Sequence, residues 1–159
     1  MTWAIRAITA DEAACLPPLL AQVQAIHAEA RPDHFRVETD PEEVLAFLRG
    51  WLSEDAVTAL VAFGPDGAAL GYLIVGIETR EASALTHPHR RAMLHHIAVD
   101  RAWRRSGIGL GLIEAMKARL RAQGVTRIAT TYAVFNAPSA ALMRKAGLEP
   151  LVIVAEGPA

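Results

Sequence analysis

The sequence has very little cysteine. Cys15 is the single cysteine in a chain of 159 residues, so no disulfide bond can form within it. That count favours a reducing compartment, and we expect a cytoplasmic protein. A lone cysteine without a distinctive neighbouring motif also gives no reason to expect a cysteine nucleophile.

The sequence also lacks an excess of charge of one sign and any long apolar run. Its 16 basic and 17 acidic residues leave a formal net charge of -1. Binding to a nucleic-acid backbone depends on a basic surface, so we expect no nucleic-acid partner. A membrane-spanning helix needs about 20 consecutive apolar residues, and none of the runs approaches that length, so we expect no membrane partner.

Two familiar ligand motifs are missing as well. A Walker-type phosphate loop needs Gly-Lys-Ser or Gly-Lys-Thr, and neither occurs. His87, His89, His95 and His96 fall within ten residues. No cysteine or carboxylate at ligand spacing completes a metal site with them, so no functional metal is expected.

What the sequence does contain is a regular succession of strands and helices. Periodicity and turn residues predict strands over residues 3–8, 56–63, 68–77, 93–99, 127–134 and 148–154. A capping box at Thr9 and Glu12 predicts a helix that is interrupted or restarted at Pro17, and Asp40 predicts the cap of a helix that begins at Pro41. Further helices are predicted to begin at 107 and 138. The resulting order is βααβββαβαβ. Because strand and helix alternate in the second half, part of the sheet should be parallel. We predict one domain over residues 1–159, of class α/β (α+β), with a twisted mixed sheet and helices on both faces.

The segment from Ile97 to Gly111 carries the chemistry. A strand ends, a short loop with Arg104 and Arg105 follows, and glycines open a long helix. The first turn of a helix has unpaired N–H groups and a partial positive charge, and glycine lets a bulky anion reach that backbone. The pattern therefore indicates a site for a pyrophosphate. The alternative is that the glycines only allow the helix to pack against the sheet.

These residues resemble a known family. Arg104-x-x-Gly107-x-Gly109 is similar to the signature of the GNAT superfamily of N-acetyltransferases, and the strand end Ile97–Asp100 resembles the residues that precede it. Asn136, followed by Ala140, Leu142 and Gly147-Leu148, is similar to the family's later pattern. The resemblance covers nearly the whole chain and is strongest over residues 93–148.

The resemblance implies a GNAT-like fold and acetyl-CoA as cosubstrate. In it, the amides of the glycine segment hold the pyrophosphate, backbone groups at a strand bulge pair with the pantetheine arm, and Asn136 bonds that arm. The Val99 amide would also polarise the thioester carbonyl, a catalytic role. The implied cofactor residues are Ile97, Val99, Arg104, Arg105, Ser106, Gly107, Ile108, Gly109, Leu110 and Asn136.

The sequence departs from the family at two positions that often carry the proton transfers. Met143 stands where many members have a tyrosine acid, and Thr131 where some have a glutamate base. His95 is the main candidate for the base, with His96 and Glu78 as further candidates, and Tyr132 is a candidate acid. Strand alternation predicts His95 on the same side as Met93 and Ile97, and His96 on the other.

We therefore expect direct transfer of an acetyl group to a primary amine. The acceptor can be a small molecule, which we favour, or a peptide amine. A small acceptor needs a closed pocket, and the segment 32–35 is expected to close it. The alternative from another class is a coenzyme A-binding module without transferase activity, which Met143 and Thr131 favour. Pairing of two copies through the sheet edge, as a homodimer, is compatible with the resemblance.

Overall fold

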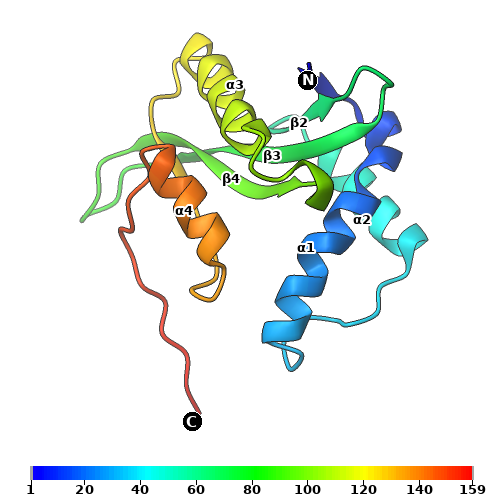
Figure 1. The fold of residues 1–159 in the computed structure, drawn as a ribbon. Helices are drawn as coiled ribbons and strands as arrows, with labels where there is room; N and C mark the ends of the chain where they lie inside the picture. The colour runs from blue at the N-terminus through cyan, green and yellow to red at the C-terminus, as the bar shows by residue number, and fades with distance from the viewer. Residues whose placement is uncertain (1, 159) are drawn as a thin grey trace.

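The computed structural model describes residues 2–158 and contains one sheet flanked by helices (Figure 1). The strands lie in the order β1 (Ala4–Ile8), β2 (Val57–Phe63), β3 (Ala69–Arg80), β4 (His89–Val99) and β5 (Ile128–Thr130). The helices are α1 (Pro17–Ala30), α2 (Pro41–Leu52), α3 (Ile108–Ala122) and α4 (Ala137–Lys145), with short 3-10 helices η1 (Ala10–Cys15) and η2 (Arg101–Trp103). The first three pairings are antiparallel and β4–β5 is parallel. The predicted fold class is confirmed.

Each face of the sheet carries its own apolar core. Leu112 and Met116 of α3 and Met143 of α4 pack on one face with Leu73 and Leu94. On the other face, α1 and α2 supply Leu19 and Leu48, which pack with Tyr72, Ile74 and Ala98 of the sheet. Because α1 and α4 therefore cover opposite faces, a ligand that contacts both must lie at the edge of β4 beyond its short pairing with β5.

The helix starts follow the capping signals in the sequence. The Thr9 side chain and Glu12 form a capping box at η1, and the backbone N–H of Thr9 donates to Glu12 over 3.0 Å. At α2, the Asp40 carboxylate accepts a hydrogen bond from the backbone of Glu42 over 2.9 Å, with Pro41 as the first helical residue. Both starts were predicted.

Strand β4 contains a bulge at His95. Ile74 of β3 lies opposite His96, whereas the next residue, Val75, lies opposite Leu94. The extra residue reverses the alternation of side chains along β4, so Leu94 and Ile97 both pack on the α3 side. His95 and His96 consequently share the α1–α2 side, where they contact Trp51 and Tyr72. The predicted placement of the two histidines on opposite sides is wrong.

The last predicted strand, over residues 148–154, is also wrong: those residues form no strand. Leu151, Val152, Ile153 and Val154 are between 79% and 90% exposed, and the segment leaves the body of the molecule as an extended chain (Figure 1). A β-branched apolar run predicts a strand only if a neighbour pairs with it. Strand β5 is too short to offer one, since it spans Ile128–Thr130 in place of the predicted 127–134.

Candidate functional site

A cavity of about 570 Å³ lies between the end of β4, the start of α3, and helices α1 and α4. Its size suits a small-molecule ligand or cofactor. The lining residues are Val23, Ile26, Ile97, Ala98, Val99, Trp103, Arg104, Arg105, Gly107, Ile108, Gly109, Leu110, Asn136, Pro138, Ser139, Leu142 and Lys145. Nine of the ten cofactor residues predicted from the sequence are among them. The exception, Ser106, donates its hydroxyl hydrogen bond to the Trp103 carbonyl and so orders the loop.

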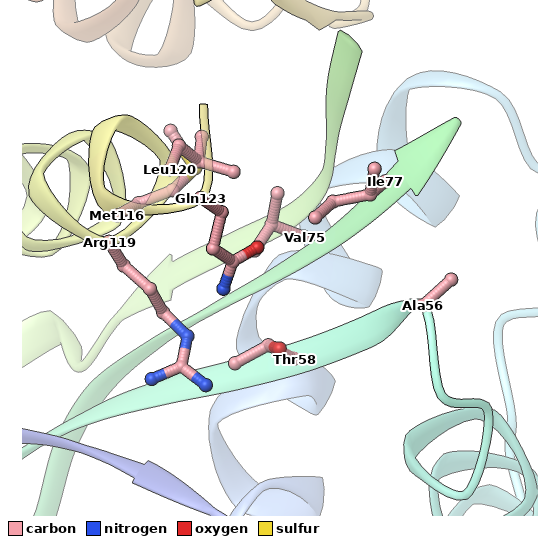
Figure 2. A pocket seen from close by; sticks show the side chains of 8 residues that line it. All are labelled: Ala56, Thr58, Val75, Ile77, Met116, Arg119, Leu120 and Gln123. Atoms are coloured by element: carbon pink, nitrogen blue, oxygen red, sulfur yellow. The ribbon is translucent and has the colours of Figure 1, made fainter. Parts of the chain in front are cut away.

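A second hollow lies between α3 and strands β2 and β3 (Figure 2). It holds only about 10 Å³, which is roughly the space that one water molecule needs. Thr58, Arg119 and Gln123 are among its lining residues. It is too small to hold an organic ligand, and the large cavity is the candidate site.

The start of α3 forms an anion cradle within the large cavity. The first intrahelical bond runs from the Gly111 amide to the Gly107 carbonyl, over 2.9 Å. The amides of Ile108, Gly109 and Leu110 precede it and have no acceptor within the helix. Gly107 has φ 88° and Arg105 has φ 63°, so both lie in the left-handed region. Such backbone turns direct successive N–H groups into a concavity that suits phosphate.

The three glycines of this segment have different roles. A methyl group at Gly111 would overlap the Trp3 ring, and one at Gly109 would lie 3.1 Å from Cδ2 of Leu142. These two glycines therefore allow close packing of α3. At Gly107 nothing lies within 4 Å of an added methyl group, and the left-handed backbone is the constraint. The packing interpretation thus holds for Gly111, but not for Gly107.

Charge in the cavity is of one sign. Arg104, Arg105 and Lys145 line it, and none of its described lining residues is acidic. The Arg104 Nε donates to the Val99 carbonyl over 3.3 Å, which holds this guanidinium beside the strand end. The cavity therefore favours an anionic ligand.

The exposed edge of β4 borders the same cavity. The Asp100 amide donates to the Leu70 carbonyl on β3 over 2.9 Å. Backbone groups alternate in direction along a strand, so those of Ile97 and Val99 point away from β3. Strand β5 pairs only with Ala92–Leu94. The N–H groups of Ile97 and Val99 and the Ile97 carbonyl are thus left to an extended ligand, whereas the Val99 carbonyl accepts from Arg104.

Asn136, at the N-terminus of α4, can serve both as a helix cap and as a ligand contact. Its Oδ1 accepts a hydrogen bond from the Ser139 amide over 3.1 Å and so caps the helix. The residue also lines the cavity. Its amide nitrogen is not needed for the cap and can donate to a ligand.

The candidate proton-transfer residues lie outside the cavity lining. His95 is exposed and its ring lies 5.2 Å from that of Trp51; a methyl group at Gly76 would lie 2.8 Å from its Nε2, so this glycine makes room for the ring. Tyr132 packs against the α3-side core, and Glu78 pairs with Arg91 at 2.9 Å. Met143 is 1% exposed in that core.

His96 is held in a different environment from His95. The Tyr72 phenol lies 2.8 Å from its Nδ1, and the two rings are parallel at 5.7 Å. Burial, with smaller effects of His27 and His95, lowers the pKa of His96 to about 4. The imidazole is therefore uncharged at neutral pH.

An aromatic cluster adjoins the cavity. The His27 ring of α1 stacks on Phe35 at 4.9 Å and meets the edge of Phe135 at 5.8 Å. Phe35 belongs to the segment that the sequence predicted to close the pocket, but Phe135 was not predicted. It is 108 positions from His27 in the chain, and no local pattern signals such a contact.

Within residues 2–158, no helix is both long and apolar enough to cross a membrane. The same residues contain no group of three or more histidine, cysteine, aspartate or glutamate side chains that could hold a metal ion.

The model of the acetyltransferase (GNAT) family matches residues 21–148 of the chain. No curated protein sequence matches it. Among solved structures, a mutant of the BH1408 protein from Bacillus halodurans has a TM-score of 0.88 and 21% identity, and the alignment covers 98% of this chain and 99% of that one.

Two further solved structures are of N-acetyltransferases whose names state the acceptor. The aminoglycoside N-acetyltransferase AAC(6')-Iy in complex with CoA has a TM-score of 0.75 and 20% identity, covering 99% of this chain and 95% of that one. A ribosomal-protein-alanine N-acetyltransferase from Brucella melitensis has a TM-score of 0.73 and 18% identity, covering 99% of both chains. At these identities the likeness establishes the fold, and the acceptors of the two enzymes differ.

Proposed function

Because the chain belongs to the acetyltransferase (GNAT) family and is an acyltransferase, we propose that it moves an acetyl group from acetyl-CoA to the primary amine of a small molecule. The observation that carries the proposal is the anion cradle at the start of α3, which opens into the same cavity as the exposed edge of β4. In this proposal, residues 1–159 form a single N-acetyltransferase domain.

The residues present fit acetyl-CoA. The amides of residues 105–110, with Arg104 and Lys145 beside them, offer donors and positive charge to the pyrophosphate. The edge groups of Ile97 and Val99 can pair with an extended amide chain such as pantetheine. Asn136 can donate its amide nitrogen to that chain while it caps α4.

When bound, acetyl-CoA supplies an acetyl group activated as a thioester. The Val99 amide donates to the carbonyl oxygen and stabilises the negative charge that grows there. The nitrogen of the neutral amine would bond to the carbonyl carbon and lose a proton to a base. The carbon–sulfur bond would break, and coenzyme A would leave as a thiolate that takes a proton from water to become the free thiol. We assign that base to His95, through water, because it lies on β4 before the cavity and is exposed.

A small acceptor is favoured because the aromatic cluster spans the space between α1 and the loop before α4. The His27–Phe135 contact at 5.8 Å joins these two segments. An extended peptide that passed between them would have to separate the rings. In this proposal the segment that holds Phe35 closes the acceptor pocket on the side of α1.

The proposal is tested by release of free thiol from acetyl-CoA, with small amines and peptides as acceptors, together with calorimetric binding of acetyl-CoA. We expect binding and thiol release with at least one small primary amine. The substitution Arg104→Ala should weaken acetyl-CoA binding about 10-fold, the effect of one charge-assisted contact. A chain that binds no acetyl-CoA would contradict the proposal.

A further inference from the structure

Three aromatic rings from separate segments meet next to the cavity. His27 comes from α1, Phe35 from the segment between α1 and α2, and Phe135 from the loop before α4. The rings of His27 and Phe35 are within 26° of parallel at 4.9 Å, whereas Phe135 meets His27 edge-on at 75°. Both arrangements are those in which aromatic rings attract one another.

The cluster has an accessible side that adjoins the cavity. Phe135 is 43% exposed, and its neighbour in the chain, Asn136, lines the cavity. Ile26, which precedes His27, is 36% exposed and lines it too, together with Val23. The α1 side of the cavity is therefore apolar and ends in aromatic rings.

The charge of this region suits a ligand with one amine better than a polycation. No acidic residue is among the described residues that line the cavity. Nearby Asp33 is paired with Arg31 at 2.8 Å, and Asp100 accepts a hydrogen bond from Gln22 over 2.9 Å. Burial lowers the pKa of His27, so this ring is neutral near pH 7 and does not repel an incoming ammonium.

We propose that the acceptor is a primary amine joined by a short chain to an aromatic ring, which packs on Phe135 and Phe35 while the amine faces the end of β4. This inference rests on the acetyl transfer proposed above and names its substrate class. A ring in this position extends an existing stack and leaves the His27–Phe135 contact in place. An aminoglycoside would bring several positive charges to this cavity, whose described lining residues include no carboxylate to pair with them.

The test compares acceptors of matched size in the thiol-release assay at saturating acetyl-CoA. 2-Phenylethylamine and 2-cyclohexylethylamine have similar apolar volumes, but only the first has an aromatic ring. We expect kcat/KM to be about 3-fold to 10-fold higher for 2-phenylethylamine, the range that aromatic pairing supplies beyond burial. Thiol release with kanamycin or with a peptide that has an N-terminal alanine should be at least about 10-fold slower, because neither acceptor places an aromatic ring on Phe135 and Phe35.

A pair of matched variants locates the effect. Phe135→Leu keeps apolar volume and removes the ring, and should reduce the preference for 2-phenylethylamine to less than about 2-fold. Phe63→Leu is the control, because Phe63 packs under the Arg6 guanidinium at 4.5 Å, on β2 and away from the cavity. It should leave the preference unchanged, and both variants should bind acetyl-CoA as the wild type does.

The outcomes separate this inference from the function on which it rests. Equal rates with the phenyl and cyclohexyl amines, or a preference that survives Phe135→Leu, overturn aromatic recognition and leave the transferase intact. Faster turnover of kanamycin or of the peptide also overturns the substrate class alone. Failure to bind acetyl-CoA overturns the proposed function and this inference together.

Discussion

The phenol oxygen of Tyr72 lies 2.8 Å from Nδ1 of His96, which links strands β3 and β4 on the α1–α2 side of the sheet. Tyr72 is fully buried, and burial raises the pKa of its phenol, so at neutral pH a protonated phenol shares one hydrogen bond with an uncharged imidazole. His27 of α1 and His95 of β4 add smaller electrostatic effects that also lower the pKa of His96. This arrangement leaves His96 with little capacity to bind a proton.

The stability of the chain should therefore fall in mild acid. His96 has a pKa of about 4 in the folded chain, against 6.5 for an ordinary histidine. Between those values the unfolded chain takes up a proton that the folded chain does not. The free energy of unfolding should decrease as the pH is lowered from 6.5 to 4, by up to about 3 kcal/mol. Urea unfolding at several pH values measures it.

His96→Gln is the matched variant, since glutamine can still form a hydrogen bond with Tyr72 and does not titrate. Between pH 6.5 and pH 4, the free energy of unfolding of this variant should decrease by less than half of the decrease in the wild type. A remainder is expected because burial also lowers the pKa of His27. If wild type and variant lose stability equally, His96 is not the titrating group.

Gly107, at the start of α3, should contribute to acetyl-CoA binding, whereas Gly67, which has a similar left-handed backbone, should not. Gly107 has φ 88° and Gly67, in the β2–β3 hairpin, has φ 80°, and neither has an atom within 4 Å of an added methyl group. Alanine at either position should cost about 1–2 kcal/mol of stability. Only Gly107→Ala should also weaken calorimetric binding of acetyl-CoA, by about 10-fold, because its methyl group enters the cradle. Equal affinities would remove Gly107 from the site.

Two substitutions at Asn136 should separate its cap from its contact with the ligand. Asn136→Asp keeps an oxygen for the Ser139 amide, so thermal unfolding should be unchanged, while loss of the donor weakens acetyl-CoA binding about 5-fold to 10-fold. Asn136→Ala should show the same binding defect and lose about 1 kcal/mol of stability as well. An aspartate variant with wild-type affinity would show that Asn136 only caps the helix.

Local patterns predicted the parts of this molecule that local physics determines. The capping box at Thr9, the start of α2 at Pro41 and the glycine segment before α3 depend on neighbours in the chain, and each occurs where expected. The mixed sheet also follows from the order of elements. Of the predicted cofactor residues, all but Ser106 line one cavity.

The features that were not predicted depend on contacts between distant segments. The bulge at His95 is set by pairing with β3, and the left-handed backbone of Arg105 is a conformation that its side chain does not favour. The cluster of His27, Phe35 and Phe135 assembles only when α1 and the loop before α4 come together. The periodicity of apolar residues in a strand or a helix contains no information on contacts between distant segments.

The exposed C-terminal run should contribute little to the stability of a single copy. Ile153 is 90% exposed, so Ile153→Ser should change the free energy of unfolding by less than about 0.5 kcal/mol. Met143→Ala, in the α3-side core at 1% exposure, should cost about 2–5 kcal/mol. The homodimer remains a prediction. Loss of stability in Ile153→Ser that grows with protein concentration would indicate that the run pairs with a second copy.

The assignment of the base is tested by His95→Gln against His87→Gln, a histidine in the exposed turn between β3 and β4. General base catalysis supplies about 100-fold or more, so kcat should fall by that factor in His95→Gln, with the KM for acetyl-CoA unchanged. His87→Gln should retain wild-type kcat. Neither His95 nor His96 lines the cavity, so the proton must reach His95 through water, and a solvent isotope effect on kcat should accompany the transfer. A His95→Gln enzyme that keeps kcat within about threefold would fall far short of that factor, and the proton would then leave to solvent without a side-chain base.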